Sequence, residues 1–136
     1  VFAETGQGAW MYERRLRASG RADMTETVYG TGLPFAGRPG LPESLQDLAR
    51  LLPQCAGVRR WGAAALDLAY VAAGRYDGFW ERSLHAWDLA AGLVIVREAG
   101  GLVEAVRQDG NILEDGAVIA ASGAMFAPFS KVIRQD

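Results

Sequence analysis

The sequence predicts a layered α/β domain in which a mixed β-sheet is flanked by helices. Helical patterns alternate with short β-prone segments through the second half of the chain, as is typical of α/β proteins. The first third instead resembles antiparallel strands joined by a tight turn, so we expect a mixed sheet. The chain has 136 residues, of which half are hydrophobic and 22% are charged. This is sufficient for one domain with a hydrophobic core.

Strand signals dominate the first third of the chain. Two β-prone segments, Ala9–Tyr12 and Arg15–Ala18, flank a tight turn at Glu13-Arg14. A further β-prone segment covers Glu26–Tyr29. Repeated Gly and Pro residues then predict a loop over Leu33–Pro42.

Helical periodicity begins after this loop. Leucines recur every three or four residues over Glu43–Leu52, which predicts an amphipathic helix that ends before Pro53. The later elements follow from apolar runs and from the Gly residues that end them. In chain order they are a strand at Gly57–Trp61, an Ala-rich helix at Gly62–Ala73, a strand at Tyr76–Glu81, a helix at His85–Ala99, strands at Leu102–Val106 and Ala117–Ala121 with a turn at Asp109-Gly110-Asn111 between them, and a helix at Ala124–Arg134.

Composition excludes several classes of site. The single cysteine, Cys55, excludes an internal disulfide, and one Cys with one His excludes a zinc site of the usual Cys/His type. The net charge of −2 gives no general attraction to nucleic acid, and the basic run YERRLRASGR at 12–21 is expected to be a solvated hairpin edge.

The sequence also suggests where the protein is located and whether further residues precede this chain. No apolar run approaches the about 18–20 residues of a membrane span, and we expect a cytoplasmic protein. The chain begins with Val1 inside a sheet-like segment, so we expect further residues before it.

The most informative stretch runs from 79 to 101, FWERSLHAWDLAAGLVIVREAGG. Asp88 lies in the first turn of the predicted helix, where a carboxylate is favoured by free N–H groups and by the helix dipole. Asp88 could therefore simply stabilise the helix start. Three features favour a ligand site instead: Trp87 can form the wall of a pocket, Glu81 ends the preceding strand, and Ala90-Ala91-Gly92 lets another backbone approach.

A second candidate lies where the Gly57–Trp61 strand meets the next helix. Gly62, Ala63 and Ala64 have small side chains that leave backbone N–H groups open to a ligand, and a helix N-terminus suits a phosphate. The alternative is tight packing of the helix on the sheet, and the residues alone leave both readings open.

The run from 59 to 101 resembles the carboxy-terminal signature of the inositol monophosphatase family, magnesium-dependent and often lithium-sensitive phosphomonoesterases. The pattern W-D-x-A-A-G is matched at Trp87–Gly92 and E-A-G-G at Glu98–Gly101. The segment ETGQGAWMYERRLRAS at 4–19 resembles the hairpin of the family. The resemblance implies that residues 1–136 form the carboxy-terminal α/β subdomain of a sugar phosphatase fold.

The resemblance also implies roles for individual residues. Asp88 matches a catalytic aspartate that binds a metal ion, and Glu81 matches an acid that hydrogen-bonds inositol hydroxyls. Gly62, Ala63 and Ala64 match a turn that contacts substrate. His85 and Trp87 are expected to support the site from behind these groups. Mg²⁺ held by carboxylates would polarise the phosphate and activate a water molecule.

The remaining metal ligands of the family have no counterpart here. They lie in an upstream glutamate pair and in a D-P-[IL]-D-G-T loop, and the sequence contains no Asp-Pro pair. We therefore expect that the amino-terminal half of the protein supplies them and that this chain alone is inactive.

Several alternatives stay open at this point. The substrate could be inositol 1-phosphate, histidinol phosphate, a fructose bisphosphate or a phosphorylated nucleotide. Some bacterial relatives are similar to factors that bind RNA polymerase, and Arg14, Arg15, Arg17 and Arg21 could serve such contacts. A homodimer is expected from the family, with Trp10, Trp61 and Trp80 as candidates for an interface or for the core.

Overall fold

A five-stranded mixed sheet forms the centre of the computed structural model, which describes residues 2–11, 13–34, 39–60, 62–84 and 86–134. The strand order is β5-β4-β6-β8-β7. Strand β4 is parallel to β5 and β6, whereas β8 is antiparallel to β6 and β7. The predicted mixed sheet is thus confirmed, but its antiparallel pairs come from β6, β8 and β7 and not from the first strands of the chain. The strands are β4 (Val28–Thr31), β5 (Gly57–Arg59), β6 (Gly78–Glu81), β7 (Leu102–Ala105) and β8 (Val118–Ala121).

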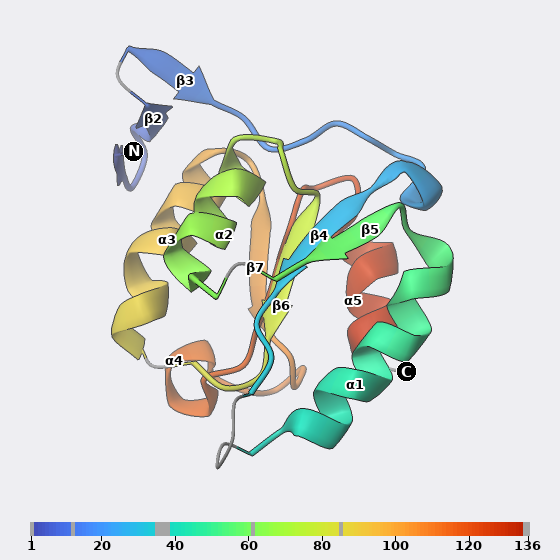
Figure 1. Ribbon diagram of the computed structural model, residues 1–136. Helices are drawn as coiled ribbons and strands as arrows, with labels where there is room; N and C mark the ends of the chain where they lie inside the picture. Colours follow the sequence, from blue (N-terminus) through green and yellow to red (C-terminus); the bar gives the residue numbers. More distant parts are fainter. Residues whose placement is uncertain (1, 12, 35–38, 61, 85, 135–136) are drawn as a thin grey trace.

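Two pairs of helices cover the two faces of this sheet (Figure 1). Helices α2 (Ala64–Ala72) and α3 (Ala86–Glu98) pack on one face, and α1 (Leu41–Leu51) and α5 (Phe126–Arg134) pack on the other. Successive residues of β6 point to opposite faces, as the period of a strand requires. Phe79 therefore joins the core under α2 and α3, while Trp80 joins the core under α1 and α5.

The first strands form a separate antiparallel sheet of three strands, β1 (Phe2–Glu4), β2 (Gly8–Met11) and β3 (Arg14–Leu16). This sheet lies against α3, with Ala9 and Leu16 buried in the same core. The backbone N–H of Gly8 donates to Glu98 Oε1 at 2.8 Å, so the end of α3 holds the turn between β1 and β2. The predicted hairpin is confirmed, although its second strand begins at Arg14, which pairs with Met11 and does not belong to the turn.

A buried carboxylate joins α1, β6 and α5. The Asp47 side chain is fully buried and accepts hydrogen bonds from Trp80 Nε1 at 3.0 Å, from Arg82 at 2.6 and 2.8 Å, and from Arg50 Nη2 at 2.8 Å. Both arginines also donate to the Ile133 carbonyl near the end of α5. Every oxygen of this carboxylate is satisfied, which is the condition for keeping a charge in the core.

Several element boundaries differ from the prediction. Glu26 does not begin a strand, because Met24–Glu26 forms a 3-10 helix in which the Asp23 side chain accepts from the N–H of Thr25. Helix α1 begins at Leu41 and not at Glu43, since Pro42 is tolerated in a first helical turn. The turn after β7 continues into a short helix missed by the prediction, α4 (Ile112–Asp115), which Asn111 caps.

The three candidate tryptophans fall into different settings. Trp80 is 1% exposed and belongs to the core. Trp10 is half-buried, and its Nε1 donates to the Gln7 carbonyl at 2.9 Å. Trp61 lies outside the described residues.

In the described part of the chain, every helix is too short or too polar to cross a membrane.

Candidate active site

The carboxyl ends of three parallel strands meet at one edge of the main sheet. Strand β4 lies between β5 and β6 and runs parallel to both, so Thr31, Arg59 and Glu81 end at the same edge. Helix α2 follows β5 and helix α3 follows β6, so both helices begin there (Figure 1). Ligands of open α/β sheets bind at such an edge.

The turn into α2 leaves its N-terminus open. Gly62 has a φ of 80°, and no described atom outside its chain neighbours lies within 4 Å of the place where its Cβ would be. Ala63 is the N-cap residue and offers no side-chain oxygen to the N–H groups of the first turn. Gly62 and Ala63 are exposed and Ala64 is half-buried. The predicted substrate turn therefore presents backbone donors at a helix N-terminus, where an anion is favoured.

Glu81 reaches from the end of β6 across the end of β4. Its carboxylate occupies the place where a side chain on Gly32 would lie. The Thr31 hydroxyl donates to the Trp80 carbonyl at 2.8 Å and ties the two strand ends together. Glu81 itself is half-buried. The structure thus places this acid at the ends of β4 and β6, and its contact with a ligand stays a prediction.

The start of α3 completes the edge. Asp88 and Trp87 lie in the first turn of α3, whose first residue is Ala86. The side chains of Trp87 and Asp88, and the whole of His85, lie outside the described part of the structure. Their predicted roles at a metal ion therefore stay predictions.

Helices α2 and α3 lie close together because of one glycine. A Cβ on Gly92 would meet Leu68 Cβ at 3.0 Å and Leu68 Cγ at 3.2 Å. The predicted close approach at Ala90-Ala91-Gly92 is thus found at Gly92, where the Leu68 side chain of α2 and not a backbone comes near, whereas Ala90 and Ala91 are exposed. The close packing brings the starts of α2 and α3 to the same part of the sheet edge (Figure 1).

Sequence reasoning missed one buried acid in this region. Asp67, in the first turns of α2, is 1% exposed, and its Oδ1 has no hydrogen-bond partner in the described structure. Burial raises the pKa of Asp67 to about 7. The signal was available, because Asp67 lies one turn before Val71 on the buried side of α2.

The described residues do not form a metal centre by themselves. Within the described ranges, no group of three or more His, Cys, Asp or Glu side chains is arranged to hold a metal ion. A single acid at Asp88 is too few oxygen ligands for Mg²⁺ or a similar hard cation.

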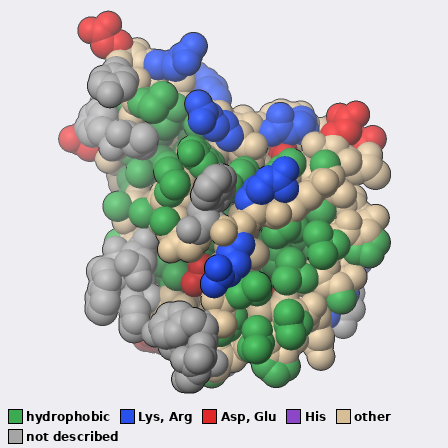
Figure 2. Space-filling model, in the orientation of Figure 1, with side chains coloured by type: hydrophobic (Ala, Val, Ile, Leu, Met, Phe, Trp, Pro, Cys, Tyr) green, Lys and Arg blue, Asp and Glu red, His purple; other side chains and the backbone are tan. Residues whose placement is uncertain are grey.

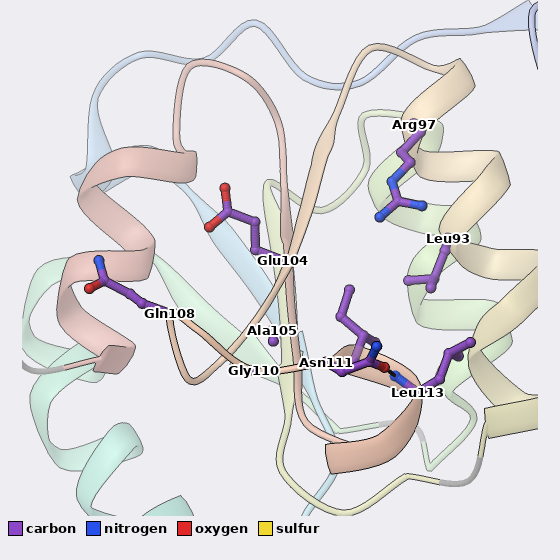
Figure 3. Close-up of a pocket in the computed structure, with 9 residues that line it drawn as sticks. Leu93, Arg97, Glu104, Ala105, Gln108, Gly110, Asn111 and Leu113 are labelled. Atoms are coloured by element: carbon purple, nitrogen blue, oxygen red, sulfur yellow. Dashed lines mark hydrogen bonds between the residues drawn. The ribbon is translucent and has the colours of Figure 1, made fainter.

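A cleft of about 430 Å³ lies elsewhere, between α3, β7 and α4 (Figure 3). Arg97 and Leu93 enter it from α3, and Asn111 and Leu113 from the start of α4. Asn111 is occupied in capping α4, with its Oδ1 accepting from Leu113 N at 3.0 Å. Among the predicted site residues whose side chains are described, none lines this cleft, so it does not change the position of the candidate site.

Comparison with known proteins identifies the family. Residues 1–134 match the inositol monophosphatase family. The chain belongs to this family. It is 46% identical over 132 residues to an inositol-1-monophosphatase from Mesorhizobium japonicum, covering 97% of this chain and 50% of that protein. It is also 48% identical over 126 residues to the Nus factor SuhB of Pseudomonas aeruginosa, covering 91% of this chain and 46% of that protein.

Solved structures of the family share the fold. The extragenic suppressor protein suhB of Bartonella henselae aligns with a TM-score of 0.91 at 41% identity, covering 97% of this chain and 51% of that one. An inositol monophosphatase from Anabaena aligns with a TM-score of 0.90 at 33% identity, covering 98% of this chain and 53% of that one. This inositol monophosphatase family chain spans about half the length of the curated relatives that it matches.

Proposed function

We propose that this chain is the carboxy-terminal half of a magnesium-dependent phosphomonoesterase that hydrolyses inositol 1-phosphate or a similar small phosphate ester. The observation that carries the proposal is the common edge at the ends of β4, β5 and β6. There the open α2 N-terminus, the Glu81 carboxylate and the start of α3 lie together. Family membership and the relatives named inositol-1-monophosphatase support this reaction class.

The α2 turn would bind an anionic or hydroxyl oxygen of the substrate. The N–H groups of Ala64, Ala65 and Leu66 precede the first helical hydrogen bond, in which Asp67 N donates to the Ala63 carbonyl at 3.0 Å. These donors are held in place by the helix and need little rearrangement on binding. Gly62 has no side chain and Ala63 has only a methyl group, so neither keeps a substrate away.

Glu81 would orient the alcohol part of the substrate. A carboxylate can accept hydrogen bonds from two neighbouring hydroxyl groups, which suits a polyol ring. Its position over Gly32 fixes it between the ends of β4 and β6. This favours inositol phosphate over histidinol phosphate, a fructose bisphosphate or a nucleotide, which are the alternatives within the superfamily.

Asp88 would supply one carboxylate ligand to Mg²⁺, with His85 and Trp87 supporting it. Bound Mg²⁺ would stabilise negative charge on the phosphate and activate a water molecule. Within the described residues no group of three or more possible ligands comes together, and the other ligands would come from the amino-terminal half of the protein. The proposal includes lithium sensitivity, which requires the complete metal site and must therefore be measured on the whole protein.

Substitution of Glu81 by Gln in the whole protein tests the substrate assignment. The change removes the charge of the acceptor, and we expect KM for inositol 1-phosphate to rise about tenfold while the Mg²⁺ requirement changes little. Glu114→Gln is the matched control, because Glu114 is exposed on α4 and does not belong to the site. An unchanged KM for Glu81→Gln would reject the polyol role.

A second candidate function is a contact with the transcription machinery. Relatives named Nus factor SuhB favour it, and Arg14, Arg15 and Arg17 are exposed in or beside β3. Arg21 is less suitable, because its Nε donates to Asp77 at 2.9 Å and its Nη2 to the Gly74 carbonyl at 2.7 Å. In the view of Figure 2 the basic side chains are spaced among hydrophobic ones, without one continuous basic surface.

A pull-down of RNA polymerase with the whole protein distinguishes the two candidates. Retention that is lost in Arg14→Ala/Arg15→Ala/Arg17→Ala would support the second function. Retention without loss in this variant would exclude these arginines as the contact.

We further propose a cytoplasmic homodimer in which each protomer contains the missing amino-terminal half. Dimer formation is tested by light scattering of the whole protein after size-exclusion chromatography. A monomer at micromolar concentration would reject it.

A further inference from the structure

Asp67 has an unusual position next to the proposed substrate turn. It lies one turn into α2, and its backbone N–H makes the hydrogen bond to the Ala63 carbonyl that begins the helix. Its side chain is 1% exposed and packs against β4, with Oδ1 3.2 Å from the place of a Cβ on Gly30. The Tyr76 ring lies against the same glycine. The carboxyl group is therefore enclosed between α2 and the sheet.

The protonation state of the Asp67 carboxyl group determines whether it can stay buried between α2 and the sheet. Oδ1 has no hydrogen-bond partner in the described structure, and a buried carboxylate without donors is strongly disfavoured. Burial accordingly raises the pKa of Asp67 to about 7, so that the neutral acid is held near neutral pH. Once ionised, the group must find hydrogen-bond donors or water.

No described cation compensates this charge. The elements packed on α2 are α3, β4, β6 and β8. Their titratable or charged side chains at this side are Tyr76, before β6, and Glu81 at its end; the Asp88 side chain on α3 lies outside the described part. The other described core side chains that face α2 are apolar: Phe79, Leu89, Leu93, Val96 and Ala120.

On α2, three backbone N–H groups precede the first helical hydrogen bond, which Asp67 N makes to the Ala63 carbonyl. They belong to Ala64, Ala65 and Leu66, and Ala63 provides no cap for them. An acid within the first turns of a helix is attracted to such groups when it is charged. They are also the groups that a substrate oxyanion would use.

We propose that Asp67 is a positioning residue for the turn Gly62–Ala64. As the neutral acid it stays buried against β4 and leaves the first-turn N–H groups available to an anionic ligand. As the carboxylate it leaves its enclosed position and competes with that ligand for the same donors. The identity of the ligand as a phosphate ester rests on the proposed function, whereas the competition itself does not.

The first experiment uses the 136-residue chain and sulfate, whose charge is constant between pH 5 and 9. The Asp67 carboxyl carbon and the amides of residues 62–66 are followed by NMR as a function of pH. We expect both to titrate with a midpoint near neutral pH. Sulfate should shift the same amides, with an affinity that falls about fivefold from pH 6 to pH 8.5.

Asp67→Asn is the matched variant, because an amide has the shape of the neutral acid and cannot ionise. In this variant the turn amides should not titrate, and sulfate affinity should be independent of pH. The proposal is overturned if the Asp67 carbon titrates near its ordinary pKa, if sulfate does not shift the turn amides, or if both proteins show the same pH dependence. The wild-type titration decides even if the variant does not fold.

The second experiment measures the pH dependence of KM for inositol 1-phosphate in the whole protein. Wild-type KM should rise above pH 7 relative to Asp67→Asn, while the ratio of their kcat values stays constant. A constant KM ratio would overturn the role in substrate binding. If the whole protein shows no phosphatase activity, the proposed function fails and the sulfate result still decides the role of Asp67.

Discussion

The two faces of the main sheet treat a buried aspartate in opposite ways. Under α1 and α5, Asp47 is surrounded by the indole N–H of Trp80 and by two arginines. Under α2 and α3, Asp67 is equally buried but has an oxygen without a donor. The first arrangement fixes three elements together. The second leaves the Asp67 carboxyl group able to gain or lose a proton. This group lies beside the edge where the proposed ligand turn begins.

The comparison is tested most severely by removing Asp47. In Asp47→Ala, Arg50 and Arg82 lose their shared partner, and the Trp80 N–H loses its acceptor. We expect the free energy of unfolding to fall by about 3–5 kcal/mol, measured by urea denaturation. Asp115→Ala is the control, because its partner Arg107 is largely exposed, and it should cost at most about 1 kcal/mol. Equal losses in the two variants would show that the Asp47 cluster contributes no special stability.

The pH dependence of stability tests the opposite behaviour of Asp67. Its pKa is about 7 in the folded chain against an ordinary value of 3.8, so between these values the folded state holds a proton that the unfolded state has released. Stability should therefore fall as pH rises from about 4 to 7. Asp67→Asn should remove this fall, and above pH 7 it should be more stable than wild type by about 2–4 kcal/mol.

Only the difference between wild type and Asp67→Asn isolates this group. Glu98 and Asp23 have lowered pKa values, from the hydrogen bonds with Gly6 and Gly8 and with Thr25 respectively. They act with the opposite sign, because their stabilisation is lost as pH falls. Parallel curves for the two proteins between pH 4 and 8 would contradict the account of Asp67.

A smaller effect is expected from filling the space at Gly32. In Gly32→Ala the new methyl group would displace the Glu81 carboxylate, which is the end of a flexible side chain. We expect stability to change by less than about 1 kcal/mol and KM for the polyol ester in the whole protein to rise about threefold to tenfold. Gly20→Ala is the control, since that position faces open space. A similar KM for both variants would show that Glu81 does not contact the substrate.

The sequence predicted the layered fold because periodicity and glycine stops are local signals. Leucine spacing identified α1, and Gly92 correctly indicated a close helix approach. The predicted boundaries were wrong where a side chain caps a short helix. Asp23 caps the 3-10 helix that contains Glu26, and Asn111 caps the four-residue helix α4.

The contacts that distinguish the two faces of the sheet could not be predicted from the sequence. Asp47 and Arg82 are 35 positions apart, and their pairing depends on how α1 docks on the sheet. The Glu81 carboxylate reaches Gly32 only because β4 and β6 are neighbours. The burial of Asp67 could have been predicted from its position on α2. Its lack of a hydrogen-bond partner could not, because that depends on how the described elements pack.

The central claim is that this chain supplies one part of a metal-dependent site, and magnesium titration of the 136-residue chain tests it most directly. Because Asp88 alone cannot form an ion cage, isothermal titration should show binding only at millimolar concentration or weaker, and phosphate release should be absent. Addition of the amino-terminal half should restore both. Micromolar Mg²⁺ binding or turnover of inositol 1-phosphate by the chain alone would contradict the account.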